Sequence, residues 1–132
     1  MPARKEVICM TILITSLTIL VAVEHLGIMA LEIWGSPAQQ AKAFGMPLSF
    51  VQQQPAQTAL ANQGIYNGML GIVILASQWL LTGTAQHLTT ALLLLYIVVV
   101  ALFGSLTVKR TIFWLQGFPA LLTLLLLLGW WL

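Results

Sequence analysis

The residues of this sequence best suited to chemistry are two carboxylates and an imidazole within a long apolar segment. Glu24, His25 and Glu32 lie between Val7 and Trp34, in a stretch with no other acidic or basic residue. A charge at mid-membrane costs on the order of 3 kcal/mol or more, so such residues face other helices and find partners there. Glu24 and His25 are expected to form either a pair that moves a proton or binds a polar headgroup, or a structural contact that locks the first helix to the second.

Helical geometry separates these three side chains. His25 and Glu32 are seven positions apart and return to one helical face, about 10 Å apart along the axis. Glu24 points roughly 100° away from His25 and is expected to reach a different neighbour. No metal site is expected, because the spacing is not Glu-x-x-His and the ligands are too few. Ser–His–Asp catalysis is excluded, since the chain contains no aspartate.

A second polar group opens the next apolar segment, in the sequence ANQGIYNG. Asn62 and Tyr66 are four positions apart, as are Gln63 and Asn67, so each pair shares a helical face. Unpaired polar groups in hydrocarbon are costly. We therefore expect Asn62, Tyr66 or Asn67 to lie within hydrogen-bond reach of the Glu–His pair in the first segment. These side chains either serve only to join the two helices or line a ligand site.

The same segment contains a stripe of glycines. Gly64 and Gly68 form a GxxxG motif, and Gly71 follows about one turn later. Small residues at this spacing let a second helix approach closely in lipid. We expect the glycines to face another helix of the same chain, because the neighbouring polar side chains need internal partners. A homodimer through this segment is the alternative.

Composition indicates the environment that must position these side chains. The chain has 132 residues, of which 60% are hydrophobic and 6% charged, whereas a soluble domain is about 25% charged. Three acids and five bases cannot cover a soluble surface of this size, so we expect an integral membrane protein. A net charge of +2 does not indicate a nucleic-acid partner. Cys9 is the single cysteine, which excludes an intrachain disulfide.

Four segments are apolar over the roughly 20 residues that a transmembrane helix needs. They are residues 7–34, 61–82, 88–106 and 111–132. Short links predict an all-α four-helix bundle with up-down-up-down topology, as a single transmembrane domain over residues 1–132. Arg4 and Lys5 precede the first apolar run as in a signal peptide. That run exceeds the roughly 7–15 residues of a signal segment, so we expect it to be retained.

The longer connection between the first two spans predicts a short helix at the membrane surface. Its sequence is PAQQAKAF. Ser36 suits an N-cap, Pro37 suits the first helical position, and Gly45 suits the C-terminal end.

The predicted topology collects the polar residues at one end of the bundle. We call the end with both chain termini the terminal end, and the opposite end the loop end. The candidates for ligand binding or proton handling lie towards the loop end: Glu24, His25, Glu32, Asn62, Gln63, Tyr66, Asn67 and Gln116. In span four, Pro119 predicts a kink, and Gln116 or a water is expected to bond the carbonyl that the proline leaves free.

Several motifs resemble one family along nearly the whole chain. EHLGIMALEIW, ANQGIYNGMLG, FGSLTV and LQGFPALLTLLLL are similar, in this order, to the small membrane proteins known as domain of unknown function 1304. ANQGxYNG is the specific run, and Met69 stands where bulky aromatics are common in that family. The resemblance implies a four-helix membrane protein and no activity. The family's recurring residues fall here on Glu24, His25, Glu32, Asn62, Gln63, Tyr66, Asn67, Gly68, Gln116 and Pro119.

Three functions are open on this basis. In the first, the polar pocket binds or moves a small amphipathic or lipophilic molecule, whose apolar part meets the Leu-rich spans. In the second, the chain is an accessory or assembly subunit of a larger membrane complex. In the third, it is a membrane isomerase or hydratase in which Glu24 and His25 exchange protons with the substrate. The first is preferred over the third, because the sequence offers no nucleophile and no cofactor motif. We expect a multi-pass protein of the bacterial inner (plasma) membrane.

Overall fold

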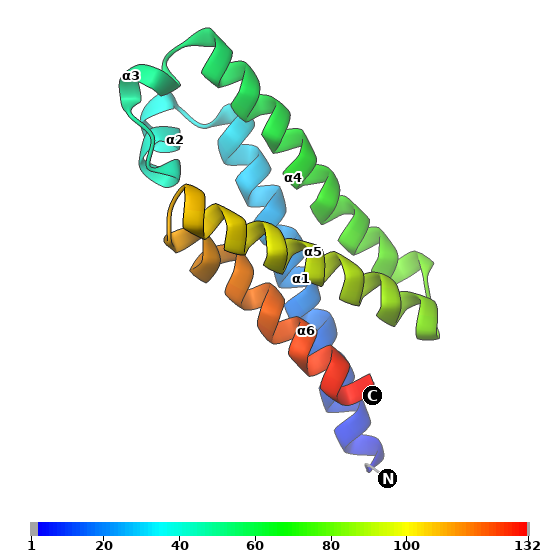
Figure 1. Cartoon of the computed structure of the whole chain (residues 1–132). Helices are drawn as coiled ribbons and strands as arrows, with labels where there is room; N and C mark the ends of the chain where they lie inside the picture. The colour runs from blue at the N-terminus through cyan, green and yellow to red at the C-terminus, as the bar shows by residue number, and fades with distance from the viewer. Residues whose placement is uncertain (1–2, 132) are drawn as a thin grey trace.

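A computed structural model describes residues 3–131 of the chain (Figure 1). All regular structure in these residues is helical, and four of the helical segments are long and apolar enough to cross a membrane. The first three are α1 (Arg4–Trp34), α4 (Gln54–Leu80) and α5 (Gly83–Thr107). The fourth joins η1 (Phe113–Gly117), a π-helical turn, to α6 (Phe118–Trp131). Two short helices, α2 (Pro37–Phe44) and α3 (Leu48–Val51), lie between α1 and α4.

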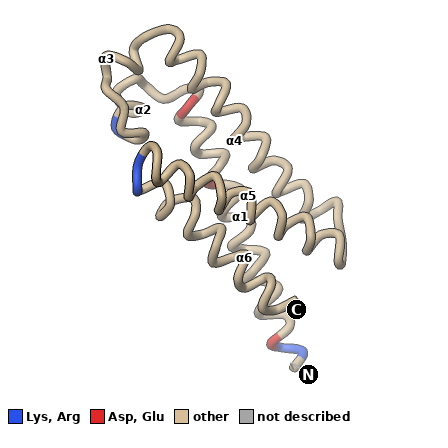
Figure 2. The backbone as a smooth tube through the Cα atoms, in the orientation of Figure 1, with Lys and Arg blue, Asp and Glu red and all other residues tan. Residues whose placement is uncertain are grey.

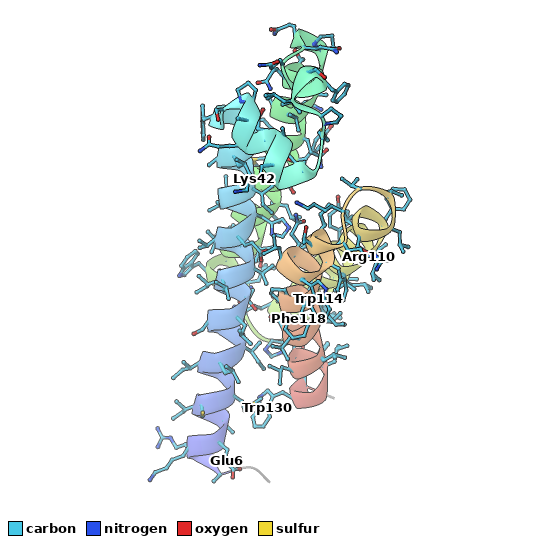
Figure 3. All side chains as sticks on the ribbon, turned by 90° about the vertical axis from the view of Figure 1, so that its left-hand side faces the viewer. Glu6, Lys42, Arg110, Trp114, Phe118 and Trp130 are labelled. Atoms are coloured by element: carbon cyan, nitrogen blue, oxygen red, sulfur yellow. The ribbon has the colours of Figure 1, made fainter. Side chains whose placement is uncertain are left out.

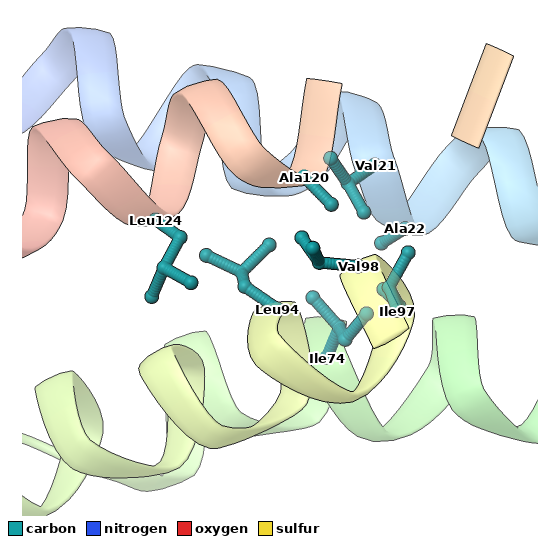
Figure 4. Packing of buried hydrophobic residues seen from close by; sticks show 8 residues of the cluster. All are labelled: Val21, Ala22, Ile74, Leu94, Ile97, Val98, Ala120 and Leu124. Carbon is teal, nitrogen blue, oxygen red and sulfur yellow. The ribbon is translucent and has the colours of Figure 1, made fainter. Parts of the chain in front are cut away.

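The helices pack around a small apolar core. α1 has its most extensive contacts with α4 and also packs against α6, while α5 packs on η1 and α6. The core takes residues from all four long segments (Figure 4): Val21, Ala22, Ile74, Leu94, Ile97, Val98, Ala120 and Leu124. Both termini lie at one end, and α2 and α3 lie at the other (Figure 1). The outward faces carry exposed Leu20, Ile65, Val99 and Leu125, as suits helices that face lipid rather than water.

The prediction that the glycine stripe faces inward is confirmed. Gly64, Gly68 and Gly71 are buried, and all three lie against α1. A Cβ on Gly71 would lie 2.7 Å from the carbonyl oxygen of Ala22. One on Gly64 would lie equally close, at 2.7 Å, to Cγ1 of Ile33. The absence of side chains therefore brings the two helix backbones close together.

Three of the spans begin earlier than predicted, and α1 does so by three residues, at Arg4 instead of residue 7. α4 begins at Gln54 instead of residue 61, with Pro55 in its first turn, where a missing N–H is harmless. α5 begins at Gly83 instead of residue 88, and Leu81 and Thr82 alone separate it from α4. Gly83 has a φ of 59°, which glycine adopts without strain. Hydropathy indicates only the apolar part of each helix, which suits lipid. The helical hydrogen bonds continue into the polar residues beyond that part.

The predicted helix between spans one and two is confirmed at Pro37–Phe44. The N–H of Gln39 donates to the Ser36 hydroxyl at 3.3 Å, and the N–H of Ser36 donates to the Gln39 side chain at 2.9 Å. These two bonds form a capping box. Gly45 ends the helix with a φ of 66°. The single turn of α3 was not predicted.

Two glutamines join this connection to the end of α1. Gln40 is fully buried, and its Nε2 donates to the carbonyls of Leu31 at 3.1 Å and Glu32 at 3.0 Å. Both carbonyls lie in the last turn of α1. The Leu31 carbonyl also accepts from the N–H of Gly35 at 2.9 Å, whereas the Glu32 carbonyl lies beyond the last helical donor. Nε2 of Gln57 donates to Oε1 of Gln40 at 2.7 Å and to the Val51 carbonyl at 2.8 Å. The network thus links α1, α2, α3 and α4.

The distortion expected at Pro119 takes the form of the π-helical turn just before it. Pro119 has no N–H, so the carbonyl of Leu115 loses its helical donor. The N–H of Phe118 donates instead to the carbonyl of Phe113, five positions back. Short π-helical turns of this kind widen a helix by one residue and often occur at functional sites.

The close approach of α1 and α4 predicts a strong effect of Gly71→Ala. The added methyl would meet a main-chain oxygen that cannot turn away, so we expect the free energy of unfolding to fall by about 1–3 kcal/mol. Gly27→Ala in α1 is the matched control, because nothing lies within 4 Å of a Cβ there. It should be neutral or stabilising, since alanine favours a helix over glycine. Tm in detergent is the measurement, and equal values for the two variants would contradict the close contact.

Candidate functional site

Three adjoining pockets between the long helices bring most of the predicted polar residues together. We name each pocket by its α1 residue. The Glu24 pocket and the Glu32 pocket each have a volume of about 250 Å³, and the His25 pocket is smaller, about 40 Å³. Gln116 of η1 lines all three. The pockets therefore meet at a single side chain, which the π-helical turn positions.

α4 supplies the other polar side chains of these pockets. Gln63 and Asn67 line both the His25 pocket and the Glu32 pocket, and Tyr66 lines the His25 pocket. Asn62 lines none of the three and is exposed. Its side chain also forms no hydrogen bond with any of residues 3–131. The structure therefore brings together seven of the candidates and leaves Asn62 outside the group.

Glu32 and Asn67 form the side-chain hydrogen bond between α1 and α4. Nδ2 of Asn67 donates to Oε2 of Glu32 at 2.8 Å, and Glu32 is only 5% exposed. The expected partner was Glu24 or His25, so this part of the prediction is corrected. The bond forms instead with the acid nearer the loop end of α1, because His25 is bonded within its own helix and Glu24 lines a pocket without α4 residues.

His25 is 2% exposed, and its ring is bonded to α1 itself. Nδ1 lies 2.8 Å from the carbonyl oxygen of Val21. A carbonyl can only accept, so Nδ1 carries a hydrogen, and Nε2 of the neutral ring is left as an acceptor. Within residues 3–131, Nε2 has no hydrogen-bond partner. The ring lines the small pocket beside Tyr66 and Gln116.

Glu24 and His25 do not form a direct pair. Glu24 is half-buried and lines the Glu24 pocket with Gln116, together with Ile28, Leu31 and other apolar residues of α1 and η1. Among residues 3–131 its carboxylate has no hydrogen-bond partner. The two neighbours in sequence therefore serve different pockets, which meet at Gln116.

Gln116 keeps its amide available to the pockets. The side chain forms no hydrogen bond with residues 3–131, so it does not bond the carbonyl freed by Pro119. An amide has two N–H donors and an oxygen acceptor. It can bind a polar group together with the Glu24 carboxylate in one pocket, and together with Nε2 of His25 in another. Within the described part of the chain, no three His, Cys, Asp or Glu side chains are grouped so that they could hold a metal ion.

Two features of the site were missed in the sequence. Tyr96 of α5 lines the His25 pocket. It lies within the run LLLLYIVVV. A single phenol in an otherwise apolar span was the signal that could have identified it as a site residue. The π-helical turn was also missed, and the only signal for it was the proline three positions after Gln116.

Comparison with known proteins extends over all of these pockets. A family model described as "Protein of unknown function (DUF1304)" matches residues 19–128. The chain is also 38% identical over 117 residues to the uncharacterized protein YpaA of Lactococcus lactis subsp. lactis (strain IL1403). That match covers 88% of this chain and 97% of YpaA. No solved structure shows a significant match.

The bond between Glu32 and Asn67 predicts that Asn67→Leu is destabilising. It leaves a buried carboxylate without its donor, so we expect the free energy of unfolding to fall by about 1–3 kcal/mol. Glu32→Gln keeps an oxygen that accepts from Asn67 and should cost less. The double variant Glu32→Leu/Asn67→Leu should recover part of the loss, because no polar group remains unpaired. Thermal unfolding in detergent gives all four values, and an unchanged Tm for Asn67→Leu would show that the bond contributes nothing.

Proposed function

This chain belongs to the DUF1304 family of proteins of unknown function, and we propose that it binds or moves a small amphipathic or lipophilic molecule within a membrane. The observation that carries the proposal is the position of Gln116, where three pockets meet. Ligand sites are mostly apolar, with a few polar groups that converge. The two larger pockets beside Gln116 are likewise mostly apolar, with a few polar side chains.

In this proposal the four long segments cross the bilayer in alternating directions as one bundle. Their length and apolar composition support this topology, as do the exposed apolar side chains on their outer faces. α2 then lies at the membrane surface, because it connects two spans and carries polar residues. The bacterial relative supports a bacterial plasma membrane as the location.

The pocket residues define the chemistry of the ligand. Nε2 of His25, as an acceptor, requires a hydroxyl or N–H on the ligand, and the Gln116 amide can bond either a donor or an acceptor. The walls of the Glu24 pocket are otherwise largely apolar, with Ile112 and Leu115 from the fourth segment. A molecule with one compact polar group and an apolar body matches these features.

The two alternatives have weaker support. An accessory subunit was inferred partly from the glycine stripe, but those glycines pack against α1 within the chain. An isomerase or hydratase needs an acid and a base on the same substrate. Glu24 and His25 line different pockets, which favours binding over proton exchange between them.

The test is retention of small molecules by the purified full chain, measured by untargeted mass spectrometry. Glu24→Gln keeps the shape of the side chain but removes the charge, and we expect about tenfold weaker retention because a hydrogen bond to a charged group is lost. Its Tm should stay unchanged, since Glu24 bonds no other described residue. Glu6→Gln is the matched control, because it changes an acid of the same helix outside the pockets.

Two outcomes would contradict the proposal. The first is a wild-type protein that retains no small molecule above the level of the detergent blank. The second is a Glu24→Gln variant that unfolds or aggregates while its folded fraction retains the molecule normally. In that case Glu24 has a structural role.

A further inference from the structure

Three of the five bases of the chain gather where α2 meets the turn between α5 and η1. Lys42 lies on α2, and Lys109 and Arg110 lie in the turn, from which the Lys109 side chain reaches α2. Figure 2 shows the basic stretches of α2 and of the turn in blue on the same side of the molecule. Glu6 lies at the opposite end of the molecule (Figure 3). Two segments distant in sequence thus form one cationic cluster.

The fold holds Lys109 in place within this cluster. Its Nζ donates to the carbonyl oxygen of Lys42 at 3.1 Å, which lies in the last turn of α2. The side-chain stem passes Gly45, where a Cβ would lie 3.5 Å from Cδ of Lys109. An ammonium group has three N–H donors, so two remain for another partner. The charge is therefore fixed in position without being neutralised.

A shallow, open groove of about 450 Å³ lies beside these cations. It is lined by Gln39, Lys42, Ala43, Lys109, Thr111 and Leu115. Ammonium, amide and hydroxyl donors therefore combine with two apolar side chains, and no acid lines the groove. Ala43, Thr111 and Leu115 also line the Glu24 pocket, so the groove and that pocket are neighbours.

An adjacent tryptophan indicates the depth of the groove in a bilayer. Trp114 precedes Leu115 and is 65% exposed, and Figure 3 shows it below Arg110 on the same side of the molecule. Tryptophan favours the level of the lipid headgroups. Basic pockets at that level bind anionic headgroups.

We propose that this groove binds the phosphate group of an anionic phospholipid, with the acyl chains along Leu115. Lys42 and Lys109 contact the phosphate, and the Thr111 hydroxyl and the Gln39 amide donate further hydrogen bonds. An anionic lipid is preferred over a zwitterionic one, because the latter carries its own cation beside the phosphate. The inference does not rest on the proposed function, since Lys42 and Lys109 take no part in that site.

Native mass spectrometry of the purified full chain tests the proposal, with phosphatidylglycerol, phosphatidylcholine or inorganic phosphate added. Lys42→Ala is the informative variant: it removes the ammonium group but keeps the main-chain carbonyl that accepts from Lys109. We expect phosphatidylglycerol retention to fall about fivefold for the loss of one cation. Lys5→Ala, at the terminal end, is the matched control and should retain the lipid like the wild type.

The outcomes separate the possible readings of the cluster. Preference for phosphatidylglycerol that inorganic phosphate does not displace supports the lipid site. Displacement by inorganic phosphate supports the same phosphate chemistry with a soluble ligand as its source. Equal retention of the two lipids by the wild type, or equal losses for Lys42→Ala and Lys5→Ala, overturns the proposal. So does a Lys42→Ala variant with a lower Tm and undiminished lipid retention, because the cluster then serves only to hold α2.

Discussion

The close approach of α1 and α4 is the contact on which the rest of this structure depends. Lipid is as apolar as the helices, so helix association there relies on close packing rather than on the hydrophobic effect. Gly64, Gly68 and Gly71 provide it by leaving room for Met29, for Leu26 and for the main chain of α1. With the two helices at this distance, the Asn67 amide reaches the Glu32 carboxylate, and a polar pair is buried without loss of its hydrogen bond.

The same contact determines which neighbouring helices the remaining polar side chains of α1 can reach. One side of α1 is occupied by α4, and the fourth segment packs against another side. Glu24 is directed to the fourth segment, where it shares a pocket with Gln116, while His25 lies between α4, α5 and η1. At the loop end, Gln40 bonds the last carbonyls of α1 and Gln57 bonds Gln40. Side-chain hydrogen bonds therefore fix polar groups of α1 both on the face that packs against α4 and at the C-terminal end of the helix.

Much of this arrangement could be predicted from local sequence patterns. The four apolar stretches, the capping residues Ser36 and Gly45 and the inward-facing glycines each depend on near neighbours in the chain. The pairing of Asn67 with Glu32 could not be predicted, because spacing gives the angle around one helix but not the offset between two. The Gln40–Gln57 network requires a turn, α3, whose sequence LSFV has no strong signal. Tyr96 has no polar residue three or four positions away on its helix, so no local pattern indicated that it lines a pocket.

The π-helical turn at Phe113–Gly117 has a consequence for how this protein can change. Such a turn holds one residue more than an α-helix needs over the same length. A single-codon deletion within it would therefore remove the extra residue without changing the residues of α6, while Pro119 still leaves the helix one N–H donor short. The same deletion would replace or rotate the Gln116 side chain. The polar junction can thus be altered by a change in chain length that leaves every residue of the apolar core in the chain.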